Sequence, residues 1–237
     1  MAALLLPGAA ICAAAQSKVT TRPGEATPGV KDDAAPSSPK KSKDAAASDT
    51  RYFYEFQQPD FVVRHIQIEH DEAGRGSVRF ERRGDEEAIV EPLELSAAAL
   101  ARISGLWRAL RFLDSDTNYQ GPKQFPSYGT SRLRMKEGGR ERTAEFNYSK
   151  DRDAFLLADE YRRAAEQSIF VFEIKVAQES QPLEAPKLLN RLDILVARKG
   201  LSDPLQLLPL LRELSTDERL PLIARNQAIR ILKKLEK

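Results

Sequence analysis

The sequence predicts an α+β fold, an antiparallel sheet with helices on one face, followed by an α-helical C-terminal extension. The first observation is a series of short segments before residue 96 in which apolar and polar residues alternate, as in half-buried strands. The second is an apolar period of three and four residues that begins after Ser96 and returns after residue 153. The third is the purely helical periodicity from Leu183 onward. Antiparallel hairpins combined with helices in this way give an α+β domain.

The predicted order is four strands, a helix, two strands and a second helix. The four strands are expected at residues 52–56, 61–70, 77–82 and 88–95. Pro59 ends the first of them, and turns rich in Asp and Gly separate the later ones. The sheet therefore begins as a series of hairpins.

A helix is expected next, with Ser96 as its N-cap and an apolar face that reaches Leu113. Gly138 lies in a Glu-Gly-Gly run, which predicts the turn of another hairpin. Its strands are expected at 132–136 and 140–148. These two strands complete the predicted sheet.

The second helix is expected over residues 153–176, although its segment 169–172 is equally compatible with a strand. The composition changes near residues 15, 50 and 180. The chain is therefore divided into a signal peptide at 1–15, a disordered linker at 16–50, an α+β domain at 51–180 and a helical hairpin extension at 181–237.

The C-terminal extension is expected to contain three helical segments. Gly200 is the predicted C-terminal cap residue of the first. The second is expected over 205–214 and the third over 222–235. The run Ser-Thr-Asp-Glu at 215–218 is the pattern of a capping box, which predicts a helix start close by.

The N-terminal residues 1–15 are apolar and small, and they end in an alanine run typical of signal-peptide cleavage near Ala15. The apolar run is shorter than the about 20 residues of a membrane-spanning helix. We therefore expect a periplasmic or secreted protein without a transmembrane span after cleavage. A lipid anchor at Cys12, the only cysteine, is not expected, because Ile11 stands where lipoprotein signals carry a small residue. A buried N-terminal helix of a cytosolic protein is the alternative.

The predicted linker contains no aromatic residue and two valines, so it lacks the apolar surface to offset its chain entropy. Its small basic cluster at 40–43 has nearby aspartates, which favours solvated charge over a nucleic-acid contact. The formal net charge of the whole chain is +2, too small for a nucleic-acid footprint. No nucleic-acid partner is therefore expected.

No catalytic, cofactor or metal site is predicted. The two histidines, His65 and His70, are five residues apart on one predicted strand and so face opposite sides of the sheet. They are interpreted as exposed strand-end residues. No Gly-x-Ser-x-Gly motif or phosphate loop occurs. Paired carboxylates for glycoside cleavage stay an open alternative, since acidic residues are plentiful.

The segment 114–130 is predicted to be a long loop rich in Tyr, Asn, Phe and Pro. Long ordered loops are often functional. Tyr119, Phe125 and Tyr128 are therefore candidate partner-binding residues. The alternative is that these aromatic side chains hold the loop on the core.

Two resemblances extend this interpretation. The hairpin order over 61–167 and the helix start at 95–100 look like those of small secreted bacterial domains of unknown function. The residues from Asp203 through the leucine-rich helix to Ile231 resemble a single HEAT-type helical hairpin. Such hairpins normally stack, so an apolar face needs cover from the domain, another subunit or a partner.

The second resemblance makes Arg225 and Ile229 further candidate partner-binding residues. The sequence therefore predicts a non-enzymatic, exported protein of the bacterial envelope that binds a protein or glycan partner. An envelope-polymer hydrolase with unidentified carboxylates and a subunit of an obligate assembly are the alternatives. No cofactor is expected, and the oligomeric state is left open.

Overall fold

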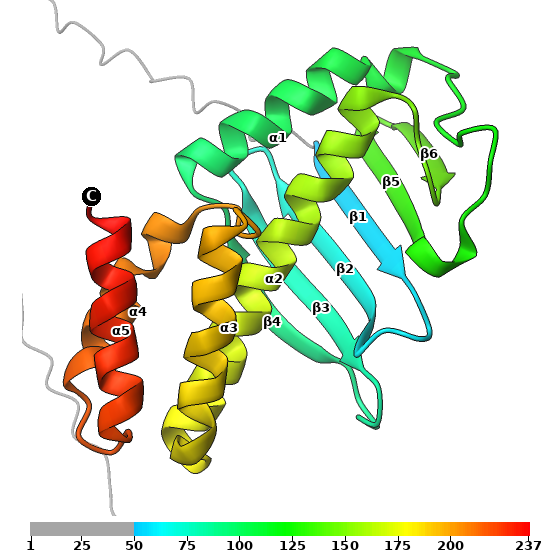
Figure 1. The fold of residues 1–237 in the computed structure, drawn as a ribbon. Helices are drawn as coiled ribbons and strands as arrows, with labels where there is room; N and C mark the ends of the chain where they lie inside the picture. The colour runs from blue at the N-terminus through cyan, green and yellow to red at the C-terminus, as the bar shows by residue number, and fades with distance from the viewer. Residues whose placement is uncertain (1–49) are drawn as a thin grey trace, which may run out of the picture. The chain divides into compact units, whose positions relative to one another are not determined.

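The computed structural model describes residues 50–237 and confirms the α+β fold (Figure 1). The predicted signal peptide, Cys12, the basic cluster at 40–43 and all of the predicted linker but Thr50 lie outside the described residues. Six strands form one antiparallel sheet in the order β4-β3-β2-β1-β5-β6. The strands are β1 (Arg51–Gln57), β2 (Val63–Asp71), β3 (Arg75–Arg82), β4 (Ile89–Glu94), β5 (Thr130–Glu137) and β6 (Arg140–Phe146).

Of the five α-helices within residues 50–237, α1 and α2 cover one face of this sheet, and the other three pack beyond α2 (Figure 1). Within the described part of the chain, no helix covers the opposite face of the sheet (Figure 1). The helices are α1 (Ala97–Leu110), α2 (Arg152–Ser180), α3 (Ala185–Ala197), α4 (Leu208–Thr216) and α5 (Leu222–Leu235).

Strand β1 lies inside the sheet and shows how its two faces differ. Its residues Tyr54 and Phe56 are buried beneath the helices. Phe53 faces the other side, where the register places it opposite Glu69 of β2 and Arg134 of β5. The alternation of apolar and polar residues therefore assigns each strand one helix-covered and one open face.

Helix α1 begins as predicted. The side chain of Ser96 accepts a hydrogen bond from the backbone N–H of Ala99 over 3.1 Å, which satisfies one of the free donors at the helix start. Ile103 and Trp107, four residues apart, are buried against the sheet. The helix ends at Leu110, and its C-cap residue Arg111 has a φ of 43°, in the left-handed region.

Helix α2 is continuous over 29 residues, so the segment 169–172 is helical rather than a strand. Leu157 and Tyr161, in its first half, belong to the core beneath the sheet. Phe170 and Ile174, in its second half, are buried at the same four-residue spacing in a separate core with α3, α4 and α5. A helical segment 169–172 buries its apolar side chains in the second core. This packing stabilises the helix and explains why the alternative strand does not form.

That second core is made by the C-terminal extension. Leu189 and Leu192 of α3, Leu211 of α4 and Ile231 of α5 are fully buried in it. The extension therefore packs on α2 of its own chain. Within residues 50–237, no helix combines the length and apolar character that crossing a membrane requires.

The predicted cap at Gly200 is wrong by one residue. Lys199, with a φ of 56°, is the residue in the left-handed conformation, and Gly200 has no positive φ. The N–H of Gly200 donates to the carbonyl of Leu195 over 2.8 Å. The helix ends one residue earlier than its glycine suggests, so a lysine occupies the position that glycine usually takes.

The predicted capping box at 215–218 does not form. Helix α4 continues through Thr216, whose hydroxyl donates to the carbonyl of Glu213 over 3.1 Å. The hydroxyl of Ser215 donates to the carbonyl of Arg212 over 2.7 Å. Both hydroxyls therefore bond to carbonyls in the last turns of α4 instead of capping the next helix. Helix α5 begins after Pro221 without a side-chain cap.

Candidate functional site

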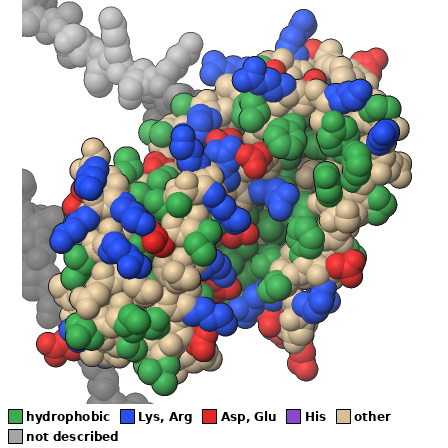
Figure 2. All heavy atoms as spheres, viewed as in Figure 1, with side chains coloured by type: hydrophobic (Ala, Val, Ile, Leu, Met, Phe, Trp, Pro, Cys, Tyr) green, Lys and Arg blue, Asp and Glu red, His purple; other side chains and the backbone are tan. Residues whose placement is uncertain are grey.

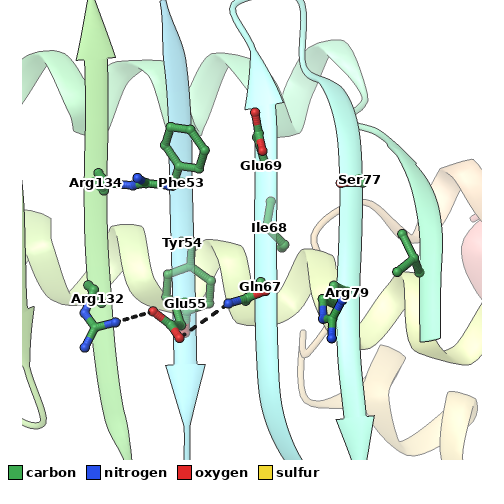
Figure 3. Close-up of a pocket in the computed structure, with 11 residues that line it drawn as sticks. Phe53, Tyr54, Glu55, Gln67, Ile68, Glu69, Ser77, Arg79, Arg132 and Arg134 are labelled. Atoms are coloured by element: carbon green, nitrogen blue, oxygen red, sulfur yellow. Dashed lines mark hydrogen bonds and ion pairs between the residues drawn. The ribbon is translucent and has the colours of Figure 1, made fainter. Parts of the chain in front are cut away.

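Two hollows of different chemistry are the strongest candidates for a site. The larger one, about 630 Å³, lies on the open face of the sheet (Figure 3). Phe53, Glu55 and Gln67 line it together with arginines of β3 and β5. We call it the open-face hollow.

Glu55 organises the charges of the open-face hollow. Its carboxylate accepts a hydrogen bond from Arg132 over 2.6 Å, which Figure 3 draws, and lies 2.8 Å from Nε2 of His65. Partial burial raises the pKa of Glu55, but the hydrogen bond from His65 and the charge of Arg132 outweigh it, so the net shift is downward. The carboxylate is thereby held ionised.

Most of the remaining charges on this face are also paired, although Glu69 has no ion pair among the described residues. Nδ1 of His65 lies 3.3 Å from Glu81, and Arg132 also contacts Glu145 over 2.8 Å. The guanidinium of Arg134 lies 3.8 Å from the centre of the Phe53 ring. Within the described residues no group of three or more His, Cys, Asp or Glu side chains is arranged to hold a metal ion. This face therefore carries a network of ion pairs, and few of its charged side chains are unpaired.

The smaller hollow, about 350 Å³, lies where the ends of β1 and β6, the loop before β5 and α2 meet. We call it the aromatic crevice. On the face drawn in Figure 2, hydrophobic side chains gather over the ends of β1 and β5, with Lys and Arg side chains beside them. The aromatic residues that line the crevice are Phe56, Phe61, Tyr128, Phe146, Tyr148 and Phe155.

Two of these aromatic side chains are unusually accessible. Tyr128, from the loop, and Phe155, from α2, are each 56% exposed. Phe125 supports Tyr128 from behind, with the two rings stacked 5.1 Å apart, and its edge contact with Tyr148 has the same centroid distance. The crevice thus has rigid aromatic walls.

Phe56 lines the bottom of the crevice, and Arg162 and Gly129 both lie close to its ring. The guanidinium of Arg162 lies 4.6 Å above the ring centre of Phe56. Gly129 has a φ of +79°, and a Cβ atom there would lie 2.6 Å from the Phe56 ring. Only glycine fits this position without displacement.

A buried hydroxyl lies under the same region. Tyr54 is fully buried, and its hydroxyl has no hydrogen-bond partner among the described residues. Burial raises the pKa of Tyr54, and the neighbouring Ser131 side chain and the charge of Arg162 only partly oppose this. Ser131 and Arg162 also line the aromatic crevice, so its polar rim lies close to this buried hydroxyl.

The structure brings together some of the predicted partner-binding residues. Tyr128 lines the aromatic crevice, and the half-buried Phe125 supports it. Tyr119 is only 3% exposed and stacks on Phe112 at a centroid distance of 6.1 Å. For Tyr119 the alternative interpretation therefore holds, because its ring pins the loop to the core.

Arg225 and Ile229 are not brought to the crevice, since no residue of α5 lines it. Arg225 is half-buried, and its Nε atom lacks a partner among the described residues. Ile229 is partly exposed beside Arg230 and Lys233. The predicted residues thus fall on two separate surfaces.

Phe155 and Arg162 were not predicted as site residues. The buried positions are Ala154, Leu157 and Tyr161, and Phe155 lies one position away from that stripe. An aromatic residue displaced from the buried period was the available signal.

His70 is fully buried, so its interpretation as an exposed strand end is wrong. Its Nδ1 donates to the carbonyl of Asp71 over 2.7 Å, and its Nε2 lies 2.7 Å from the hydroxyl of Tyr161. That hydroxyl also accepts from Nε1 of Trp107 over 2.8 Å. Burial lowers the pKa of His70, and the contact with Asp71 only partly opposes this. His70 is therefore a neutral core residue.

No family model matches the chain, and no curated protein matches it. The resemblances to small secreted domains and to a HEAT-type hairpin stay predictions.

Proposed function

We propose that the chain is a non-enzymatic, exported binding protein of the bacterial envelope. It holds an apolar side chain of an extended segment of a partner protein in the aromatic crevice. The loop at 114–130 contributes through Tyr128, and α2 contributes through Phe155 and Arg162.

The observation that carries this proposal is the pair of half-exposed aromatic walls around the crevice. Aromatic residues and arginine are enriched where protein interfaces bury their strongest contacts. A volume of about 350 Å³ is near the lower end of the range for ligand pockets. It suits one large side chain of a peptide better than a whole cofactor.

The other potential chemistry of the chain supports a binding role. His65 is held between two carboxylates, and His70 is buried in the core. Both histidines therefore have structural partners. The crevice contributes apolar contact and hydrogen-bonding groups, which are what recognition of a peptide requires.

A peptide-display selection tests the proposal. The whole chain is the bait, and the double variant Tyr128→Ser/Phe155→Ser is the counter-bait. Selected peptides should share an apolar residue and bind the double variant about 30-fold or more weakly, the effect of losing a strong interface contact. Leu183→Ser is the control, because Leu183 is 82% exposed on a different surface. Peptides that bind wild type and double variant equally would refute the proposal.

A further inference from the structure

We infer that the ligand of the aromatic crevice is an acidic peptide, whose carboxylate is bound by a basic hollow beside the crevice. This inference rests on the proposed function and specifies its ligand. The basic hollow, about 470 Å³, is lined by Asp159, Arg162, Arg163, Glu166, Arg198 and Lys199, together with Gly200.

The two hollows share a wall. Asp159 and Arg162 line both the aromatic crevice and the basic hollow. A peptide with its apolar side chain in the crevice therefore carries its neighbouring residues past the basic hollow. The charge of those residues decides whether the contact is favourable.

Most of the positive charge in the basic hollow is unpaired. Arg163 forms ion pairs with Asp159 and with Glu160. Arg162, Arg198 and Lys199 form none with a carboxylate within residues 50–237. Glu166 is the one lining carboxylate without an ion pair in that part of the chain, so the free charges have a positive sum.

Arg162 is held in a position suited to a carboxylate. Its guanidinium is stacked on Phe56, which limits its rotation and links it to the floor of the crevice. The N–H groups at the edge of a guanidinium match the two oxygens of a carboxylate. Arg162 is thus placed to contact both the apolar side chain and the carboxylate of the proposed ligand.

Lys199 contributes a cation to the basic hollow from the end of α3. It has a φ of 56°, a conformation that residues with a Cβ rarely adopt, although a glycine follows it directly. A lysine at 199 directs a cation to the basic hollow, which glycine at the same position would not do.

The inference is tested by anisotropy of three fluorescein-labelled peptides with the whole chain. The first combines Asp and Glu with Phe and Leu, the second replaces the acids by Asn and Gln, and the third keeps the acids but replaces Phe and Leu by Ser. The first should bind about tenfold more tightly than the second, as expected for loss of a charge-assisted contact. Its advantage should shrink as NaCl is added.

Lys199→Gly and Arg111→Gly form a matched pair of variants. Each removes a positive charge and relieves a left-handed backbone position at a helix end. Only Lys199→Gly should weaken binding of the acidic peptide, by about fivefold, with no change for the amide peptide. Arg111→Gly should change neither, because Arg111 lines neither hollow.

The outcomes separate the two claims. Equal binding of the acidic and amide peptides, or an unchanged affinity in Lys199→Gly, would overturn this inference and leave the proposed function standing. Tight binding of the third peptide alone would also overturn it, because the anion would then bind without its anchor. Failure of all three peptides would count against both the inference and the proposed function.

Discussion

The guanidinium of Arg162 covers the ring of Phe56, with 4.6 Å between its central carbon and the ring centre. This contact joins α2 to the end of β1 and keeps a cation at the boundary of the aromatic crevice and the basic hollow. A planar, stacked cation has a fixed orientation, which a flexible ammonium group lacks.

Arg162→Lys is therefore expected to weaken binding of the acidic peptide although the charge is kept. Loss of the stacked contact is worth about 0.5–1 kcal/mol at an exposed site, which corresponds to a two- to fivefold lower affinity. Anisotropy measures the affinity. Arg152→Lys, at the start of α2 and outside both hollows, is the control. Unchanged affinity in Arg162→Lys would show that only the charge matters.

Gly129→Ala is expected to destabilise the fold by about 2–3 kcal/mol, because left-handed strain and a collision add together. The new Cβ would lie 2.6 Å from the Phe56 ring and 2.8 Å from the carbonyl of Gln57. Gly138→Ala is the comparison, since Gly138 has a φ of +53° but nothing within 4 Å of an added Cβ. Urea unfolding of both variants separates the two contributions. Equal losses of stability would contradict the close approach at Gly129.

Acidification through pH 6.5 is expected to lower the free energy of unfolding. His70 has a pKa below its ordinary value of 6.5 in the folded state, so the unfolded chain takes up the proton first. Stability is therefore complete above pH 6.5 and is lost as the pH falls toward the lower folded-state pKa. Urea midpoints between pH 7.5 and 5 measure the slope.

Two variants identify the histidine that causes this pH dependence of stability. His70→Gln should remove the dependence, because its side chain does not ionise. His65→Gln, on the open face of the same strand, should retain it. A slope that persists in His70→Gln and vanishes in His65→Gln would move the effect to the open-face hollow.

Phe170→Ala is expected to destabilise the chain by about 3–5 kcal/mol, the range for removing a buried aromatic side chain. Phe170 is fully buried in the second core. Phe155→Ala, on the same helix, should change stability by no more than about 0.5 kcal/mol, because its side chain is half-exposed. Thermal unfolding compares the two variants. A large loss in Phe155→Ala would mean that Phe155 serves packing rather than binding.

The strands and the start of α1 were predictable because their signals are local. Alternation along β1 and β3 and the side-chain cap at Ser96 depend on neighbours in sequence. The end of α3 was not predictable in the same way. Whether Lys199 or Gly200 takes the left-handed position depends on where the helix stops packing, which is not a local signal. The continuous α2 was also undecided, since only the second core favours helix at 169–172.

The candidate site was predictable only in part. Loop length and aromatic content led to Tyr128, but they gave the same weight to Tyr119, which is buried. The distinction depends on Phe112, a partner seven residues earlier that stacks on the Tyr119 ring. Arg162 could not be selected from many arginines, because its role comes from Phe56, which lies on another element.

Helix α2 carries Arg162 in its first half and Phe170 in its second, so the aromatic crevice and the C-terminal helices share one continuous helix. Because both cores pack on this helix, we expect them to unfold as a single cooperative unit. A ligand that restrains the first half of α2 should therefore slow amide hydrogen exchange in α5, although it touches no residue there.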